Sequence, residues 1–158
     1  MSTPIKTYRS TKTYGHEVGL SCAFRQWRAK DSHCRFLHGY ALAVKIEFVA
    51  ETLDSRNWVV DFGSLESFKS RLRERFDHKT VIAQDDPKLD YFRQGRDLGV
   101  LDLVVLQHVG CEKFAEEIFG MANEWLGTGG LLSGRVKVAS VTVSEHGANS
   151  ATYSEEDV

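Results

Sequence analysis

His33-Cys34-Arg35-Phe36-Leu37-His38-Gly39-Tyr40 stands directly before the run Ala41-Leu42-Ala43-Val44-Lys45-Ile46-Glu47-Phe48-Val49. The alternation of apolar and polar side chains predicts a half-buried β-strand over residues 41–51. If this strand begins a few residues early, His38 and Tyr40 share one of its faces, and Cys34 lies opposite them on the preceding loop. Taken alone, His38 is more simply explained as a half-buried histidine and Cys34 as an inert buried cysteine. Their clustering at the mouth of one strand favours a functional site.

The composition is that of a soluble globular chain. The 158 residues are 42% hydrophobic and 27% charged, with a formal net charge of -2, which predicts a single domain over residues 1–158. The charges are mixed along the chain, so no basic patch indicates nucleic acid, and no apolar run approaches the roughly 18 residues of a membrane span. The three cysteines form no close pair, and the N-terminus lacks a signal-peptide core. We therefore expect a cytoplasmic protein with neither nucleic-acid nor membrane partners.

Periodicity along the chain predicts four strands and two helices. Residues 6–25 and 41–51 are predicted to pair as a long hairpin, with a surface loop over residues 26–37. Helical spacing of apolar residues predicts helices over 64–76 and 112–125, and alternation predicts strands over 136–145 and 148–153. Residues 83–99 are predicted to be a loop with one helical turn, and the acidic tail 154–158 to be disordered. The expected fold is α+β in the order ββααββ, an antiparallel four-stranded sheet with two helices on one face.

Cys34-x-x-x-His38-Gly39-Tyr40 resembles the Cys-x-x-x-His-Gly-His signature of the 6-pyruvoyltetrahydropterin synthase and 6-carboxytetrahydropterin synthase family. Further resemblances follow in the family's order: Trp58-Val59-Val60-Asp61-Phe62, then Phe76-Asp77-His78, then Glu112 before Phe114-Ala115, then Val141-x-Val143-x-Glu145. Together they extend from about Gly15 to Tyr153. The resemblance implies the tunnelling fold (T-fold), in which subunits join their sheets edge to edge, and a homohexamer built as a dimer of trimers.

The resemblance also implies roles for individual residues. Cys34 would be the general base of a lyase acting on a dihydropterin triphosphate-type substrate, assisted by Asp77 and His78. Glu145 would anchor the pterin, with Glu112 as a second contact. The chemistry suits these residues, because a carboxylate accepts two N–H donors of a pterin edge in a fork, and a cysteine removes a proton only as its thiolate. Without the resemblance, Glu145 would be a solvated strand-end charge and Asp77-His78 an ordinary helix C-terminus.

The zinc ligands implied by the resemblance are incomplete in this chain. The family holds zinc with three imidazoles, one in a Ser-x-x-His-Arg context and two in His-Gly-His. Here Phe24 and Tyr40 stand at two of these positions, and only His38 matches. One imidazole is too few for a catalytic zinc site, which needs about three protein ligands. We therefore expect little or no zinc, unless substitute ligands complete a shifted site; the candidates are Cys22, His16 and His33.

Two classes of function follow from the sequence. The first is a lyase of the pterin synthase type, or a metal-free pterin aldolase-like enzyme that uses Cys34, His78 and Tyr40. The second is a zinc-deficient pterin- or purine-binding homologue that keeps the pocket at Glu145 and lacks the parent activity. Metal content and ligand binding distinguish the two classes.

Overall fold

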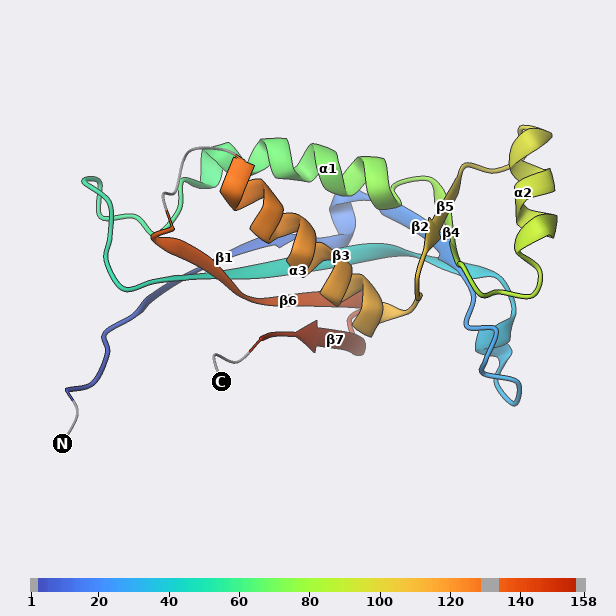
Figure 1. The fold of residues 1–158 in the computed structure, drawn as a ribbon, viewed down its shortest axis with the longest axis horizontal. Helices are drawn as coiled ribbons and strands as arrows, with labels where there is room; N and C mark the ends of the chain where they lie inside the picture. The colour runs from blue at the N-terminus through green and yellow to red at the C-terminus, as the bar shows by residue number, and fades with distance from the viewer. Residues whose placement is uncertain (1–2, 129–133, 156–158) are drawn as a thin grey trace.

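The computed structural model describes residues 3–128 and 134–155, and a seven-stranded sheet forms its framework (Figure 1). The strands are β1 (Tyr8–Tyr14), β2 (Leu20–Phe24), β3 (His38–Ala50), β4 (Lys79–Ala83), β5 (Leu103–Leu106), β6 (Val136–His146) and β7 (Asn149–Tyr153). They lie in the order β5-β4-β2-β3-β6-β7, and β1 pairs with the second half of β3. The α-helices are α1 (Glu66–Phe76), α2 (Leu89–Asp97) and α3 (Cys111–Thr128).

Strand β3 pairs with three other strands, β1, β2 and β6. Its first residues pair with β2, with His38 opposite Phe24 and Tyr40 opposite Cys22, and its second half pairs with β1 and β6. The alternating sequence of the strand gives alternating burial, so that Leu42, Val44, Ile46 and Phe48 lie in the core. The prediction of a strand here is confirmed, and it begins early enough to include His38 and Tyr40.

Gly39 is required by the close approach of β2 to β3. A Cβ atom at this position would lie 2.7 Å from the Cys22 carbonyl oxygen, which is a contact with backbone that cannot move aside. We expect Gly39→Ala to lower the free energy of unfolding by about 1–3 kcal/mol through overpacking. Chemical denaturation measures this change, and Gly120→Ala is the matched control, since a Cβ there meets nothing within 4 Å. Equal stability of the two variants would contradict this account of Gly39.

The predicted four-stranded antiparallel sheet and the order ββααββ are wrong. The segment predicted as one strand over residues 6–25 is two strands, because a 3-10 turn at His16–Val18 ends in Gly19 with a left-handed φ of 75°. Strands β4 and β5 were not predicted; β4 pairs in parallel with β2, and β5 in parallel with β4, so the sheet is mixed. The chain also has a third helix, because residues 89–97 form α2 where only a single turn was expected.

Helices α1 and α3 cover the same face of the sheet (Figure 1). Helix α1 buries Phe68, Leu72 and Phe76, and α3 buries a longer stripe that includes Phe114 and Ile118. Phe76 and Phe114 meet edge to face, with ring centroids 5.3 Å apart. Both predicted amphipathic helices are therefore confirmed, and their apolar stripes close the main core.

Helix α2 stands apart from this core, at the end of the sheet where β4 and β5 lie (Figure 1). Its Leu89 and Phe92 pack with Ile82 of β4 in a small separate cluster. None of the helices in residues 3–128 and 134–155 has the length and hydropathy of a membrane span. In the tail predicted to be disordered, residues 154–155 have no regular structure, and residues 156–158 lie outside the described residues.

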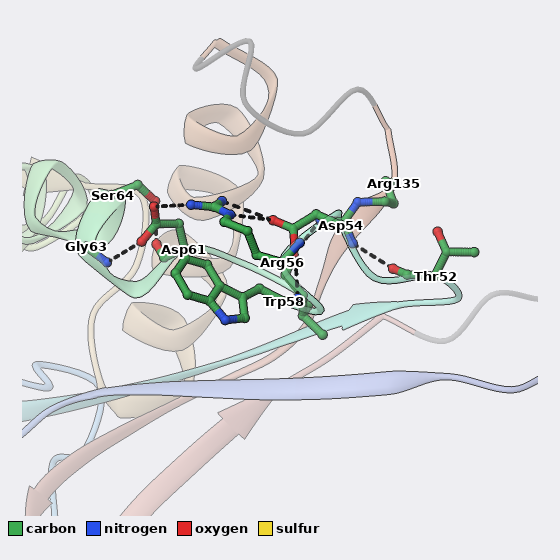
Figure 2. Close-up of polar contacts among 9 residues, drawn as sticks. Thr52, Asp54, Arg56, Trp58, Asp61, Gly63, Ser64 and Arg135 are labelled. Carbon is green, nitrogen blue, oxygen red and sulfur yellow. Dashed lines mark hydrogen bonds and ion pairs between the residues drawn. The ribbon is translucent and has the colours of Figure 1, made fainter.

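The motif residue Asp61 has a structural role in the connection from β3 to α1 (Figure 2). Its carboxylate accepts the Gly63 N–H at 2.9 Å, which caps the turn that leads into α1. Arg56 bridges Asp54 and Asp61 and lies over the Trp58 ring, 4.1 Å from its centroid. The match of Trp58-Val59-Val60-Asp61-Phe62 to the family motif therefore marks the entry to the helix.

Candidate active site

A cavity of about 250 Å³ lies where β2, the start of β3, the start of α3 and the strands β6 and β7 meet. Residues from four separate segments line it: Cys34 on the loop after β2, His38 at the start of β3, Glu112 in the first turn of α3, and Glu145 near the end of β6. Phe24 lies beside them. The fold thus brings together four residues that the sequence analysis singled out across more than 100 positions of chain.

Local hydrogen bonds hold Cys34 at the edge of this cavity. The residue lies in a 3-10 turn, His33–Arg35, whose N-cap Ser32 accepts the Cys34 N–H at 3.1 Å. The Cys34 carbonyl accepts the backbone N–H of Gln26 at 2.9 Å. The thiol is half-buried. It is therefore held in place and still open to a ligand in the cavity.

Cys111 lines the cavity beside the two carboxylates, and no sequence pattern had singled it out. Burial raises the pKa of the Cys111 thiol to about 12, and the charges of Glu145 and Glu112 and a hydrogen bond to Glu145 act in the same direction. The sequence feature that could have identified Cys111 is its position directly before Glu112, at the start of a predicted helix. The Cys111 side chain gives the Glu145 carboxylate a neutral, protonated neighbour.

The three positions that correspond to the family's zinc ligands do converge. The rings of Phe24, His38 and Tyr40 contact one another, with centroid distances between 5.4 and 6.3 Å. Only one of these rings is an imidazole, and burial raises the pKa of the Tyr40 phenol, as does the charge of Glu145. A phenol held in its protonated form is a poor metal ligand. These residues do not fit a zinc ion.

None of the proposed substitute ligands repairs this set. Cys22 is buried, and burial raises the pKa of its thiol to about 12, so it stays protonated at neutral pH. His16 is exposed, with Nδ1 2.5 Å from the Ala41 carbonyl oxygen, and His33 is exposed on the loop. Within residues 3–128 and 134–155, no group of three or more His, Cys, Asp or Glu side chains is arranged to hold a metal ion.

A second imidazole approaches the aromatic cluster from β6. The His146 ring lies 5.9 Å from the Tyr40 ring, centroid to centroid. Its Nδ1 accepts the Ala148 N–H at 3.2 Å, which fixes the turn into β7. In the sequence, His146 falls between the strands predicted over residues 136–145 and 148–153. The antiparallel pairing of β3 with β6 brings the end of β6 near the start of β3, and no local pattern reveals that proximity.

Asp77 and His78 lie at the end of α1, against the start of β2. The Asp77 carboxylate accepts the Ser21 N–H at 3.3 Å and lies 2.7 Å from His78 Nδ1. His78 has a left-handed φ of 57°, which is strained for a residue with a side chain, and its imidazole is 86% exposed. Neither Asp77 nor His78 is among the described residues that line the cavity. Within one chain, the oriented imidazole points to solvent.

A larger groove, about 1,100 Å³, runs between α1 and α3. Long charged side chains line it, including Arg71, Arg75, Glu116 and Glu117, and it holds none of the residues predicted for the site. Charged side chains of both signs neutralise one another there. The smaller cavity at Cys34 is the better candidate, because it combines a half-buried thiol with two carboxylates.

The environments of the three cysteines predict their reactivity. At pH 8, a thiol with a pKa of about 12 has roughly a thousandfold less thiolate than an ordinary one. We expect a thiol-specific reagent to label Cys34 in the native protein, and to label Cys22 and Cys111 only after unfolding. Peptide mapping after brief labelling checks the assignment of the labelled cysteine, and rapid native labelling of Cys111 would contradict it.

The raised pKa values of Cys22 and Cys111 also make the free energy of unfolding fall as pH rises from about 9 to about 12. The reason is that the unfolded thiols lose protons that the folded ones keep.

The comparisons with known proteins agree with this fold. The family model described as 6-pyruvoyl tetrahydropterin synthase matches residues 15–156. The 6-carboxy-5,6,7,8-tetrahydropterin synthase of Aquifex aeolicus is 26% identical over 125 residues, which cover 78% of this chain and 76% of that protein. Two solved structures share the fold: an uncharacterized protein of Wolinella succinogenes (TM-score 0.76, 22% identity) and a 6-pyruvoyl tetrahydropterin synthase of Plasmodium vivax (TM-score 0.69, 18% identity). In both comparisons the matched region covers 96% of this chain and 99% of the chain in the solved structure.

The mixed sheet and the helices on its face define an α+β fold of the tunnelling-fold class. The chain belongs to the 6-pyruvoyl tetrahydropterin synthase family.

Proposed function

We propose that this protein is a 6-pyruvoyl/6-carboxytetrahydropterin synthase-like lyase that acts on a dihydropterin triphosphate-type substrate. The observation that carries the proposal is the meeting of Cys34, Glu112 and Glu145 in one cavity. Two carboxylates suit the N–H donors of a pterin ring, and a thiol beside them suits proton transfer. The three cysteines are free thiols, which agrees with a reducing, cytoplasmic setting.

In this proposal each residue has a distinct task. Glu145 accepts two N–H groups of the pterin edge, and Glu112 adds a second contact. Cys34, as its thiolate, removes a proton from the carbon side chain of the substrate. Tyr40 lies beside the cavity lining, with its ring against His38, and it keeps its proton because burial and the charge of Glu145 raise its pKa. No step passes through zinc, because the residues at the ligand positions do not fit it.

Asp77 and His78 enter the proposal through a second copy of the chain. The cavity of one chain, at about 250 Å³, is below the roughly 300–1,000 Å³ of typical ligand pockets. His78 is oriented by Asp77 and points to solvent. An assembly that brings this pair to the Cys34 of a neighbour would enlarge the site and supply a base next to the thiol.

We expect the protein to form a homohexamer, built as a dimer of trimers. Within the described residues, β1 pairs only with β3 and β7 only with β6, so both have an open outer edge. Such edges carry unpaired backbone groups, which a neighbouring strand can satisfy. Light scattering at micromolar concentration should give about six times the chain mass of 17.8 kDa. A monomeric mass would contradict both the assembly and the shared site.

The altered zinc positions favour a second candidate function. Phe24 and Tyr40 at two ligand positions are what a pterin- or purine-binding homologue without the parent activity would show. This protein would keep the carboxylates and lose turnover. A metal-free aldolase-like cleavage that uses Cys34, His78 and Tyr40 is the corresponding enzymatic alternative.

Equilibrium binding tests what these alternatives share. Calorimetry with a 7,8-dihydropterin should show saturable binding to the wild-type protein, and guanine serves as the purine comparison. We expect the dihydropterin to bind more tightly, because Cys34 lines the cavity and would contact the side chain that guanine lacks. Absence of dihydropterin binding would overturn the proposed function.

A further inference from the structure

The loop that carries Cys34 is attached to the rest of the molecule through Arg25. The Arg25 guanidinium donates to both oxygens of Asp86, from Nε at 2.7 Å and from Nη2 at 2.6 Å. Its remaining nitrogen, Nη1, donates to the carbonyl of Arg35 at 3.2 Å. Arg35 is the residue directly after Cys34. One side chain therefore connects the backbone beside the reactive thiol to the segment that follows β4.

Asp86 is built as a fixed anchor for this contact. Its side chain is 1% exposed, and Arg25 is 19% exposed. Burial alone would raise the pKa of Asp86, but the hydrogen bonds from Arg25 and from the Lys88 N–H, together with the Arg25 charge, hold it below its usual value. Separating a buried carboxylate from its cation costs a large free energy, so the contact between Arg25 and Asp86 resists displacement of the loop.

The neighbouring Asp85 holds the same loop at a second point. Its carboxylate accepts the indole N–H of Trp27 at 3.2 Å and an Arg28 N–H at 2.6 Å. This pair is much more exposed than the first, with Arg28 63% and Asp85 37% exposed. Exposed ion pairs contribute little to stability. The buried Arg25 and Asp86 contact is thus the main attachment of the Cys34 loop on this side.

We propose that Arg25 and Asp86 are positioning residues that set where the Cys34 thiol sits in the cavity. The forked guanidinium matches the carboxylate in one geometry, and its third contact extends that geometry to the backbone next to Cys34. Neither residue lines the cavity, so both act through the loop. The importance of this placement for catalysis depends on the proposed function, whereas the placement itself does not.

The test measures the reactivity of Cys34 without any substrate. The rate of alkylation of Cys34 by iodoacetamide is followed against pH, located by peptide mass mapping, at a temperature where circular dichroism shows every variant folded. Asp86→Asn removes the charge and keeps the shape, and Arg25→Lys keeps a charge but loses the fork. Glu117→Gln is the control, because it breaks the Arg75–Glu117 ion pair between α1 and α3, away from this loop.

We expect Asp86→Asn to raise the alkylation rate about tenfold, since release of the loop exposes the thiol. Arg25→Lys should give a smaller rise and a shifted pH profile, and Glu117→Gln should give neither. Unchanged rates and pH profiles in both loop variants, with only a lower melting temperature, would overturn the proposal. If Asp86→Asn does not fold, Arg25→Lys decides by the same criterion. If the rates change as expected but the wild-type protein binds no dihydropterin, the positioning role stands and the proposed function fails.

Discussion

Glu145→Gln is expected to weaken dihydropterin binding by at least about 30-fold, which corresponds to about 2 kcal/mol. The change removes a charge-assisted acceptor and turns one oxygen into a donor that faces the N–H donors of the ring. Glu112→Gln should cost much less, because Glu112 is exposed at the start of α3 and Glu145 is half-buried. Calorimetry on both variants measures the difference.

Glu51→Gln, at an exposed position after β3, is the matched control for the loss of one charge. The thermal stability of Glu145→Gln has to be compared as well, since Glu145 also contacts Cys111. Equal weakening by Glu145→Gln and Glu112→Gln would show that Glu145 is not the principal anchor.

The double change Phe24→His with Tyr40→His is expected to raise zinc content from well below one per chain to about one per chain. The rings at positions 24, 38 and 40 already contact one another, so three imidazoles there would form a nearly complete tetrahedral set. Each single change leaves two imidazoles and should do much less. Lyase turnover should rise with the metal content.

Elemental analysis of the purified proteins gives the zinc content directly. Phe24 is buried against Phe114, with ring centroids 5.0 Å apart, so Phe24→His alone serves as the control for lost packing. One tightly bound zinc per chain in the wild-type protein would mean that our account of the metal site is wrong. Cys22→Ala would then identify the substitute ligand, because a thiolate is the ligand that zinc would favour there.

Sequence periodicity predicted the elements that lie half in the core and half in solvent. Strand β3 and helices α1 and α3 all have one buried face, and their apolar residues recur with the matching period. Strand β4 was missed because four of its five residues are buried, which leaves no alternation to detect. The break between β1 and β2 depends on the left-handed backbone of Gly19, which a run of β-forming residues conceals.

The candidate site was predictable only where residues stand within a recognisable motif. Cys34 and His38 were singled out by their clustering before a strand and by the family resemblance, Glu145 by the resemblance alone, and the fold brings all three to one cavity. Cys111 and His146 were missed because their proximity arises from long-range pairing and from the docking of α3. Their place beside Glu145 and Tyr40 is a property of the tertiary fold.

Turnover by chelator-treated protein tests the central claim most directly. The wild-type protein is freed of metal, mixed with 7,8-dihydroneopterin triphosphate, and followed by chromatography of the pterin products, with Cys34→Ala assayed in parallel. Our account predicts that the metal-free wild-type protein consumes the substrate, and that Cys34→Ala is slower by about a hundredfold or more. Binding of the substrate without any consumption, or an unchanged rate in Cys34→Ala, would contradict it.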